Sequence, residues 1–581
     1  MKKLKQKLRI FILSHIFKHT YQHYCSLLND CKQLTESSQC KDAEITRLRE
    51  ISLNQEKEII SLKELNQFND EKNIQYLVIT ETKDQQIKQL MDQNHNLELQ
   101  VQQLIERNQQ YEIQNKQCNE NTKKSLELIQ LLECYIIGKG TNNFSSMSSF
   151  SYDCLHRILE TDKLNGSETF KIVTTDIYKF DIEIIKKKPK IKVAFLSPLS
   201  STWSCDSIYR KLASDSRFDT YIIVVPFEYG QDRNTIDTEY IANCDFFEKK
   251  KYRYIKSYDV KKKKYLTFEE AGVPDIVFQL TPHTAFMPDN FKIDSLHLNV
   301  LNVYIPYGYM IVNEYDMQFN QKSHHLFWKI FCETPLHKKM AMEHSLIRDI
   351  NVECSGYVKM DQLLDDSKIE RADNIWKIPR NKNKDEIIKI IWAPHHALVQ
   401  QPSTFGTFHK NYMFFYELAK SMPGISWIVK PHPLLKNDSI HFGIFKDSLE
   451  FNEYMKRWDD LPNARTVQDG NYIDIFKTSD AMILDSVSFL AEYLFTQKPS
   501  LFLTKSSNTF NDFGQVIKES HYQTDGENFE EIKSFIYNVL IQKNDSKREI
   551  REEIYNKYLN FNNGIYATEY IYKYLLGCFE N

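Results

Sequence analysis

The printed sequence holds 581 residues, too many for one ordinary hydrophobic core, so two or three domains are expected. With 75 Lys+Arg against 78 Asp+Glu, the formal net charge is -3, which leaves no global positive field to hold nucleic acid. The 11 cysteines show no CxxC pair and no zinc-like spacing with histidine. That pattern argues against a disulfide framework and against a structural zinc site.

Residues 1–34 are predicted to form a basic amphipathic segment. Apolar side chains recur at helical spacing, with lysines crowded at the start, at Leu4, Leu8, Phe11, Ile12 and Ile16. Such a helix can lie in the headgroup layer of an anionic membrane, and the alternative is a solvated helix end that packs on a neighbouring chain. No run of about 18 apolar residues occurs, so no transmembrane helix is expected.

Residues 35–137 are rich in Gln, Asn, Glu and Lys and contain neither Gly nor Pro. Their most regular part alternates by three and four residues through Ile87, Leu90, Asn94, Leu97, Val101, Leu104, Asn108, Tyr111, Asn115 and Cys118. The asparagines of this seam fall at a positions, where they cost stability but favour one register and a defined oligomer. We expect a long α-helical coiled coil that forms a homo-oligomer, a dimer; the alternative is one long helix docked on the globular part. Residues 138–189 then form a linker and the entry to that part.

Beyond residue 190, short apolar runs alternate with helical stretches. The predicted strands form two sets, 191–197, 220–226, 275–280 and 300–305, then 387–393, 425–430, 480–485 and 499–504. Continuous apolar runs separated by helices are typical of parallel sheets buried on both faces. We therefore expect an α/β fold with two facing Rossmann-like domains, over residues 190–365 and 366–581.

Polar residues follow four of these predicted strands. They are Pro306-Tyr307-Gly308-Tyr309, Pro394-His395-His396, Lys430-Pro431-His432-Pro433 and Asp485-Ser486-Val487-Ser488. Because ligands bind at the carboxyl ends of strands in open α/β sheets, these elements are expected to converge on one cleft. Each also has an ordinary interpretation: the serines as helix N-caps, the histidines as hydrogen-bonded structural residues, and the tyrosines as core aromatics.

The residues after the second set of strands suit an anion. His432 is held between two prolines with its ring free to donate to a phosphate, and Lys430 adds a positive charge beside it. Ser486 and Ser488 stand where a helix begins, so their hydroxyls and the free N–H groups of the first turn form an anion site favoured by the helix dipole.

The order of several short strings is also characteristic. In chain order they are Ser355-Gly356-Tyr357-Val358-Lys359-Met360-Asp361, Ala393-Pro394, Lys430-Pro431-His432-Pro433, Asp474-Ile475-Phe476 and Asp480 through Ser488, followed by Lys498-Pro499. This series resembles the CDP-glycerol glycerophosphotransferase family, the teichoic-acid polymerases and their capsule relatives. The likeness covers roughly residues 190–570, leaves the coiled coil outside, and is most specific from Asp474 to Tyr493.

This resemblance implies a GT-B fold and a CDP-linked donor. It implies a transferase that moves a phosphorylated polyol, such as glycerol phosphate, to a surface polysaccharide or teichoic-acid-like acceptor. The first Rossmann-like domain would bind the acceptor and the second the nucleotide donor. By motif, His432 would contact the donor phosphates, and Ser486 and Ser488 would cradle the pyrophosphate. Lys430 and Asp485 complete the predicted donor site.

Two departures from the family pattern concern the catalytic base and the transferred group. The family's Trp-His-Gly, whose histidine is the proposed base, is Pro306-Tyr307-Gly308 here, and tyrosine with an ordinary pKa near 10 is a poor base. His395 or His396 is therefore the candidate base, with a phosphate contact as the alternative. Tyr307 stays a catalytic candidate.

Gly308 and Tyr309 are the candidates on the acceptor side. The family's Pro-Thr-Trp-Arg is Pro394-His395-His396-Ala397 here, which leaves the transferred group open. No acidic pair follows a predicted strand, so neither an obligatory metal nor a cofactor is expected.

Three other functions stay open at this point. They are a GT-B glycosyltransferase that uses a CMP-activated sugar acid for capsule synthesis, a CDP-linked phosphoryl modification of capsule sugars, and a non-catalytic scaffold of a capsule complex. We expect a cytoplasmic protein, peripheral on the inner face of the bacterial cell membrane, with a lipid-linked or polysaccharide acceptor and no nucleic acid partner. The basic runs 186–192 and 261–264 favour contact with an anionic membrane, and ordinary solvated loops are the alternative.

Overall fold

The structure is a computed structural model that divides into two units, Met1–Val173 and Thr174–Asn581. It describes residues 44–61, 85–110, 112–113, 116, 178–179, 181–229, 232–296, 300–365, 375–379, 386–398, 404–468 and 472–580. The basic segment predicted at 1–34 and the linker part 138–177 lie outside the described residues. No helix in the described ranges is long and apolar enough to cross a membrane.

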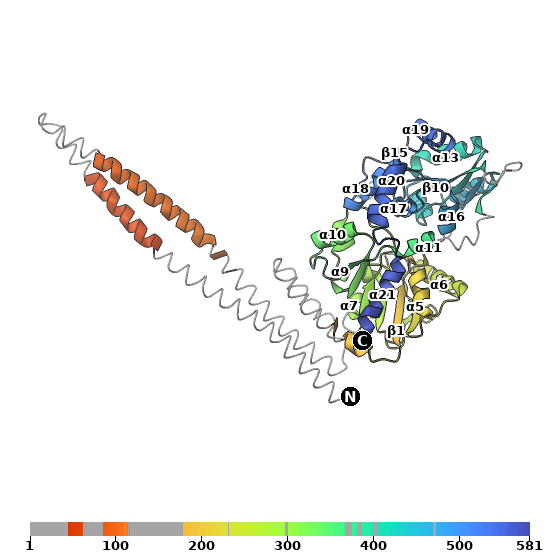
Figure 1. Ribbon diagram of the computed structural model, residues 1–581, viewed down its shortest axis with the longest axis horizontal. Coiled ribbons are helices and arrows are strands. Elements are labelled where there is room, and N and C mark those ends of the chain that lie inside the picture. The colour runs from red at the N-terminus through yellow and green to blue at the C-terminus, as the bar shows by residue number, and fades with distance from the viewer. Residues whose placement is uncertain are drawn as a thin grey trace. The chain divides into compact units, whose positions relative to one another are not determined.

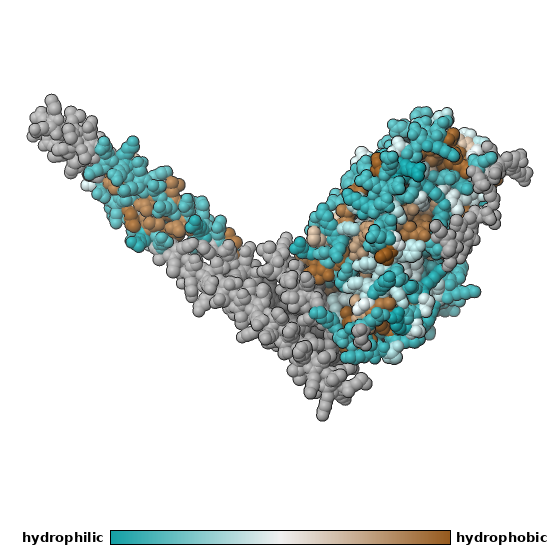
Figure 2. Space-filling view, in the orientation of Figure 1, coloured by the Kyte–Doolittle hydropathy of each residue, from teal (hydrophilic) through white to brown (hydrophobic). Residues whose placement is uncertain are grey.

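In the first unit, residues 44–61 and 85–110 form two helices that run side by side in opposite directions (Figure 1). Ile87, Asn94 and Asn108 of the predicted seam are buried, as are Ile45 and Ile59 of the other helix. The outer surface of the two helices is mainly hydrophilic, with apolar patches (Figure 2). Asn94 lies in this seam, and its Oδ1 accepts a hydrogen bond from Ser52 Oγ at 2.5 Å. The asparagine therefore fixes the register within one chain. The homodimer stays a prediction.

The second unit contains a seven-stranded parallel sheet, in the order β3-β2-β1-β6-β7-β8-β9. Its strands are β1 (Ile191–Ser197), β2 (Phe218–Val224), β3 (Tyr254–Lys256), β6 (Ile276–Gln279), β7 (Leu301–Tyr304), β8 (Lys329–Cys332) and β9 (Val352–Cys354). Strand order reverses between β1 and β6, which is the switch point of a doubly wound fold. Helices α5 (Asp206–Ala213), α6 (Arg233–Lys250) and α10 (Pro335–His344) belong to this domain, as does the small antiparallel pair β4 (Tyr258–Asp259) and β5 (Lys264–Tyr265).

A second parallel sheet of six strands has the order β12-β11-β10-β13-β14-β15. Its strands are β10 (Ile388–Ala393), β11 (Ile425–Val429), β12 (Ala464–Thr466), β13 (Ala481–Leu484), β14 (Ser500–Thr504) and β15 (Tyr522–Asp525). Here the strand order reverses between β10 and β13. The fold is thus α/β with two Rossmann-like sheets, the GT-B-like arrangement expected from the sequence.

Large aromatic side chains fill the core of the second sheet. Trp392, Trp427 and Trp458 are each at most 1% exposed, and they come from β10, β11 and α15 (Ser448–Asp460). Trp392 also stacks on Phe415 of α13 (Phe408–Ser421), with ring centroids 4.6 Å apart. Removing one such buried ring typically costs about 3–5 kcal/mol, so this core holds the strand ends in fixed positions.

The last helix, α21 (Ala567–Phe579), returns to the first sheet. Ala567, Ile571 and Leu575 recur every four residues and are buried in the core of that sheet. The backbone N–H groups of Ala567 and Thr568 donate to the Asp361 carboxylate at 2.9 and 2.8 Å. The sequence prediction had placed all of 366–581 in the second domain. The structure differs for α21, because an apolar stripe alone does not show which core receives it.

Loops from the two sheets contact each other beside α18 (Asp512–Ile517). Asn511 Nδ2 donates to the carbonyl oxygen of Met310 at 2.8 Å, and the Asn511 N–H donates to Ile311 O at 3.0 Å. Val312 and Phe510 form an isolated antiparallel bridge. A Cβ atom on Gly514 would lie 2.3 Å from Ile311 O, so only glycine allows this approach.

The basic runs of the first domain are partly neutralised. Lys188 forms an ion pair with Asp275, and Lys263 forms one with Asp237. Lys192 Nζ donates to Gly272 O at 3.0 Å. These contacts favour the solvated-loop interpretation of the two runs, while attachment to a membrane stays a prediction.

Replacing Gly514 by alanine is expected to destabilise the contact between the two sheets. The new methyl would meet backbone oxygen and the Phe510 ring, and overpacking of this kind costs about 1–3 kcal/mol. Calorimetry should show a lower melting temperature for Gly514→Ala. The control is Gly577→Ala, because a Cβ on this helical glycine meets no atom within 4 Å. Equal melting temperatures for the two variants would contradict the prediction.

Candidate functional site

Three histidines meet where β10 and β11 end. Pro394 leads from β10 to His395 and His396, and His432 follows β11. The His432 N–H donates to Pro394 O at 3.0 Å, which ties the two loops together. The ring centroids are 4.5 Å apart for His395 and His396, 5.1 Å for His395 and His432, and 4.2 Å for His396 and His432. We call these three side chains the histidine cluster.

Two rings of the histidine cluster present N–H groups. The Ala397 N–H donates to His395 Nδ1 at 3.3 Å, and the Leu434 N–H donates to His432 Nδ1 at 3.1 Å. Since Nδ1 accepts in both rings, the proton of each neutral imidazole is on Nε2. Burial, with the other histidines of the cluster, lowers the pKa of His395 well below 6.5 and that of His432 to about 3. Both rings are therefore neutral N–H donors at pH 7.

His396 has the opposite proton arrangement. Its Nδ1 lies 2.6 Å from Oδ2 of Asp438, in α14 (Leu435–His441). A carboxylate only accepts, so Nδ1 carries the proton and Nε2 of the neutral ring keeps its lone pair. The histidine cluster thus combines two N–H donors with one basic nitrogen.

The histidine cluster also has the proximity that a metal site requires. One ring nitrogen from each histidine lies within 4.8 Å of the others, the one such group found in the described part of the chain. A metal needs the lone pair of each ligating nitrogen, usually with the other ring N–H donating to an acceptor. His395 and His432 instead receive backbone N–H groups at Nδ1. This chemistry fits an oxyanion better than a cation.

Asp485 positions the histidine loop from inside the protein. Its carboxylate, 1% exposed, accepts hydrogen bonds from the His395 N–H at 2.5 Å, from Thr407 Oγ1 at 2.7 Å and from the Thr407 N–H. Burial raises the pKa of Asp485 to about 6, against the lowering effect of these donors. The structure thus gives Asp485 a positioning role, where the sequence had suggested a phosphate contact.

The first turn of α17 (Val487–Leu494) faces the loop after β7. Ser486 is the N-cap, but its side chain makes no capping hydrogen bond. A Cβ atom on Gly308 would lie 2.9 Å from Ser488 Oγ, so Gly308, predicted on the acceptor side, and Ser488, predicted on the donor side, lie next to each other. The structure therefore brings these predicted residues together at a helix N-terminus, where an anion is stabilised.

The two tyrosines of this loop occupy different environments. Tyr307 is 36% exposed, and its carbonyl accepts a hydrogen bond from Tyr357 Oη at 2.5 Å. Desolvation and the charge of Glu314 raise the Tyr307 pKa, which keeps the phenol protonated and disfavours it as a base. Tyr309 is 2% exposed and packs on Tyr357 and Phe513, with ring centroids 5.2 and 5.6 Å away. Its environment is that of a core aromatic rather than an acceptor contact.

Lys430 is buried at the end of β11, 5% exposed. Its backbone N–H donates to Trp392 O at 2.8 Å, which continues the β10–β11 ladder. Its charge contributes to the low pKa of His432. The structure thus places a lysine beside the histidine cluster, as the sequence had suggested.

A polar cluster that the sequence interpretation did not assign joins the two domains. The Tyr472 hydroxyl donates to Glu492 of α17, and Lys359 Nζ lies 4.2 Å from the centre of the Tyr472 ring. Burial raises the pKa of Glu492 to about 7, and Lys359 opposes this effect. Both charged residues stand in the strings that carried the family resemblance. Asp438 was also missed, because no local pattern connects it with His396, 42 residues earlier.

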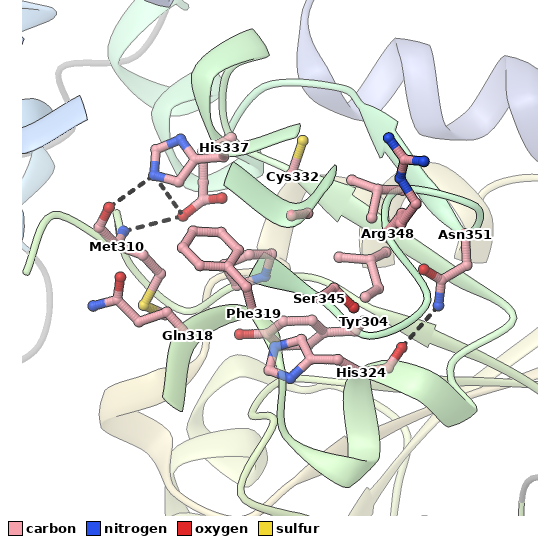
Figure 3. Close-up of a pocket in the computed structure, with 15 residues that line it drawn as sticks. Tyr304, Met310, Gln318, Phe319, His324, Cys332, His337, Ser345, Arg348 and Asn351 are labelled. Carbon is pink, nitrogen blue, oxygen red and sulfur yellow. Dashed lines mark hydrogen bonds and ion pairs between the residues drawn. The ribbon is translucent and has the colours of Figure 1, made fainter. Parts of the chain in front are cut away.

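Side chains that line a separate pocket in the first domain hold the loop after β7 (Figure 3). The Met310 N–H donates to Glu333 Oε1 at 3.1 Å, and His337 Nε2 donates to Met310 O at 2.8 Å. Glu333 is 2% exposed and its pKa is raised by burial. These contacts hold Met310, whose carbonyl oxygen also accepts from Asn511 Nδ2.

The pKa of Glu492 predicts a pH effect on stability. A folded-state pKa of about 7, against 4.5 for an ordinary glutamate, means that the folded protein holds an extra proton between these values. Stability from this group is complete below about pH 4.5 and is lost as the pH rises through 7, by at most roughly 3 kcal/mol. The free energy of unfolding of Glu492→Gln should not show this fall with rising pH. Glu530→Gln, at an exposed glutamate, should keep it, and parallel pH curves for wild type and Glu492→Gln would contradict the assignment.

Comparisons with known proteins give similarity of fold. No family model and no curated protein matches the chain. A solved structure of a variant of the wall teichoic acid polymerase TagF is 13% identical, with a TM-score of 0.45, and the match covers 74% of this chain and 98% of that one. A UDP-N-acetylglucosamine 2-epimerase from Listeria monocytogenes is 12% identical (TM-score 0.43; 68% and 97% covered). The UDP-GlcNAc 2-epimerase from Neisseria meningitidis, bound to UDP-GlcNAc, is 16% identical (TM-score 0.42; 67% and 100% covered). At these values the similarity bears on neither activity nor substrate.

Proposed function

We propose that this chain is a transferase that moves a phosphorylated polyol, such as glycerol phosphate, from a CDP-linked donor to a surface polysaccharide or teichoic-acid-like acceptor. The observation that carries the proposal is the proton arrangement of the histidine cluster. Two neutral N–H donors and one basic nitrogen stand together at the carboxyl ends of β10 and β11. A phosphoryl-type transfer needs these two kinds of group, donors for the phosphate oxygens and an acceptor for one proton.

The donor diphosphate would lie between the histidine cluster and α17. His395 and His432 would donate their Nε2–H groups to phosphate oxygens, and Lys430, two residues before His432, adds a positive charge. The free N–H groups at the start of α17 add the positive end of a helix dipole. The histidine cluster follows β10 and β11, and the start of α17 follows β13. Both therefore flank the switch point of the second sheet, where ligands bind in such folds.

The reaction then needs one base. The acceptor hydroxyl oxygen would attack the phosphorus that carries the polyol, and the bond from this phosphorus to the bridging oxygen of the diphosphate would break. CMP leaves with that electron pair, and the hydroxyl proton passes to Nε2 of His396. Asp438, 2.6 Å from Nδ1, would stabilise the imidazolium that results. Tyr307 stays a proton donor, because its pKa is raised.

Nucleotide binding is the first test of this proposal. Melting temperature is measured with CMP, CDP, CDP-glycerol, CDP-ribitol, CMP-sugars, UDP and GDP. A ligand at 100 times its Kd adds about 2.7 kcal/mol, and cytidine nucleotides should give this shift because the proposed donor carries cytidine. His432→Ala should lose it, while His441→Ala, at an exposed histidine of α14, should keep it. Stabilisation by uridine or guanosine nucleotides alone would contradict the assignment of a cytidine-linked donor.

Turnover with the best donor tests the base. His396→Gln should lower kcat by about 10²–10⁴-fold, because a positioned base contributes that much, with the nucleotide shift retained. Asp438→Asn should reduce kcat less, since the amide oxygen still accepts the Nδ1 proton but does not carry the charge that stabilises the imidazolium. Unchanged kcat in Asp438→Asn would remove Asp438 from the mechanism, and full activity in His396→Gln would remove the base.

A further inference from the structure

Three aromatic side chains gather at the surface of the first domain, and we call them the aromatic platform. Phe227 and Tyr229 stack nearly parallel, with centroids 6.3 Å apart and an interplanar angle of 21°. Phe286 meets both rings edge-on, at 5.7 Å from Phe227 and 4.6 Å from Tyr229. Tyr229 is 60% exposed. The exposed ring of Tyr229 is thus held in place by two partly buried aromatic rings.

The aromatic platform lies at the carboxyl end of the first sheet. Phe227 and Tyr229 follow β2, while Phe286 ends η3 (Thr284–Phe286), the turn after β6. Strand β1 separates β2 and β6 in the sheet, and the Glu228 N–H donates to Phe286 O at 2.8 Å. The platform therefore bridges two loops beside the switch point of this sheet, where ligands bind in open α/β folds.

Polar contacts hold Glu228, between the two platform residues Phe227 and Tyr229, in place. The Glu228 carboxylate accepts from Arg233 Nη1 at 2.9 Å and from the Tyr265 hydroxyl. The guanidinium of Arg233 lies 4.6 Å from the centre of the Tyr258 ring. These contacts hold Glu228, which stands between Phe227 and Tyr229 in the chain, before binding, which lowers the entropy lost when a ligand arrives.

His283 gives the platform a neutral hydrogen-bond donor. Its ring centroid lies 6.5 Å from that of Phe286, and Gln321 Nε2 lies 3.2 Å from its Nδ1. An amide nitrogen donates, so Nδ1 accepts and Nε2 carries the proton; burial also lowers the His283 pKa. The turn of His283 follows β6, which pairs with β7, so it is next to the loop of Tyr307.

We propose that the aromatic platform binds a sugar ring of the acceptor. A pyranose presents C–H groups on its faces and hydroxyls at its rim, which suits the negative face of an aromatic ring beside a neutral N–H donor. An alkyl chain would gain nothing from His283 and the Glu228–Arg233 pair at the edge. This assignment rests on the proposed function, since it names the acceptor class for the same enzyme.

Saturation-transfer NMR on the full chain tests the sugar assignment. The probes are diacetylchitobiose, cellobiose and lactose at millimolar concentration, with octyl glucoside as the alkyl-bearing comparison. Wild type should bind at least one free disaccharide, and Tyr229→Ala should weaken it by about tenfold, the loss of one stacked contact. Tyr537→Ala, at a tyrosine that is 56% exposed elsewhere, should bind like wild type.

The cytidine-nucleotide melting shift of Tyr229→Ala separates the two proposals. It should equal that of wild type, because the platform belongs to the other sheet. Sugar binding that depends on Tyr229 without any cytidine shift in wild type would leave the platform standing and overturn the donor. Absence of sugar binding by wild type, equal binding by Tyr229→Ala, or binding of octyl glucoside alone would overturn the platform assignment.

Discussion

The buried carboxylate of Asp485 is the contact on which the candidate site depends. One side chain accepts from the backbone of His395 and from both donors of Thr407, so it joins the end of β13 to the loop after β10 and to the start of α13. These are the two strands between which the order of the sheet reverses. Asp485 thus holds the loop of His395 and His396, and the bond from the His432 N–H to Pro394 O joins His432 to that loop. A buried charge of this kind is tolerated because three donors replace the lost water.

The groups that contact Nδ1 of each ring decide what the histidine cluster can do. The N–H groups of Ala397 and Leu434 occupy Nδ1 of two rings, and the carboxylate of Asp438 occupies Nδ1 of the third. The same three histidines with carbonyl groups in place of those N–H groups would suit a transition metal. The chemistry of the cluster is therefore determined by the groups that contact the three rings. A sequence motif does not show these groups.

The sheets could be predicted from the sequence because buried parallel strands are continuous apolar runs. All eight predicted runs are strands, whereas five further strands of the two sheets, β3, β8, β9, β12 and β15, were not predicted, because runs of three or four residues carry too little pattern. The grouping of His395, His396 and His432 followed from the rule on strand ends. The contact of Asp438 with His396 and the aromatic platform could not be predicted in this way. These contacts join residues 42 or more positions apart in the chain. The asparagine seam predicted a paired helix but not that Ser52 of the same chain supplies the partner.

Helix α21 has a topological consequence. Because it belongs to the core of the first sheet while residues 388–525 form the second, the chain passes from one sheet to the other twice. A single cut in either crossing leaves the two halves covalently tethered. Two tethers restrict sliding and separation but permit rotation about a line through both crossings. A swing of one sheet relative to the other about this line is therefore the motion that two crossings leave least restricted.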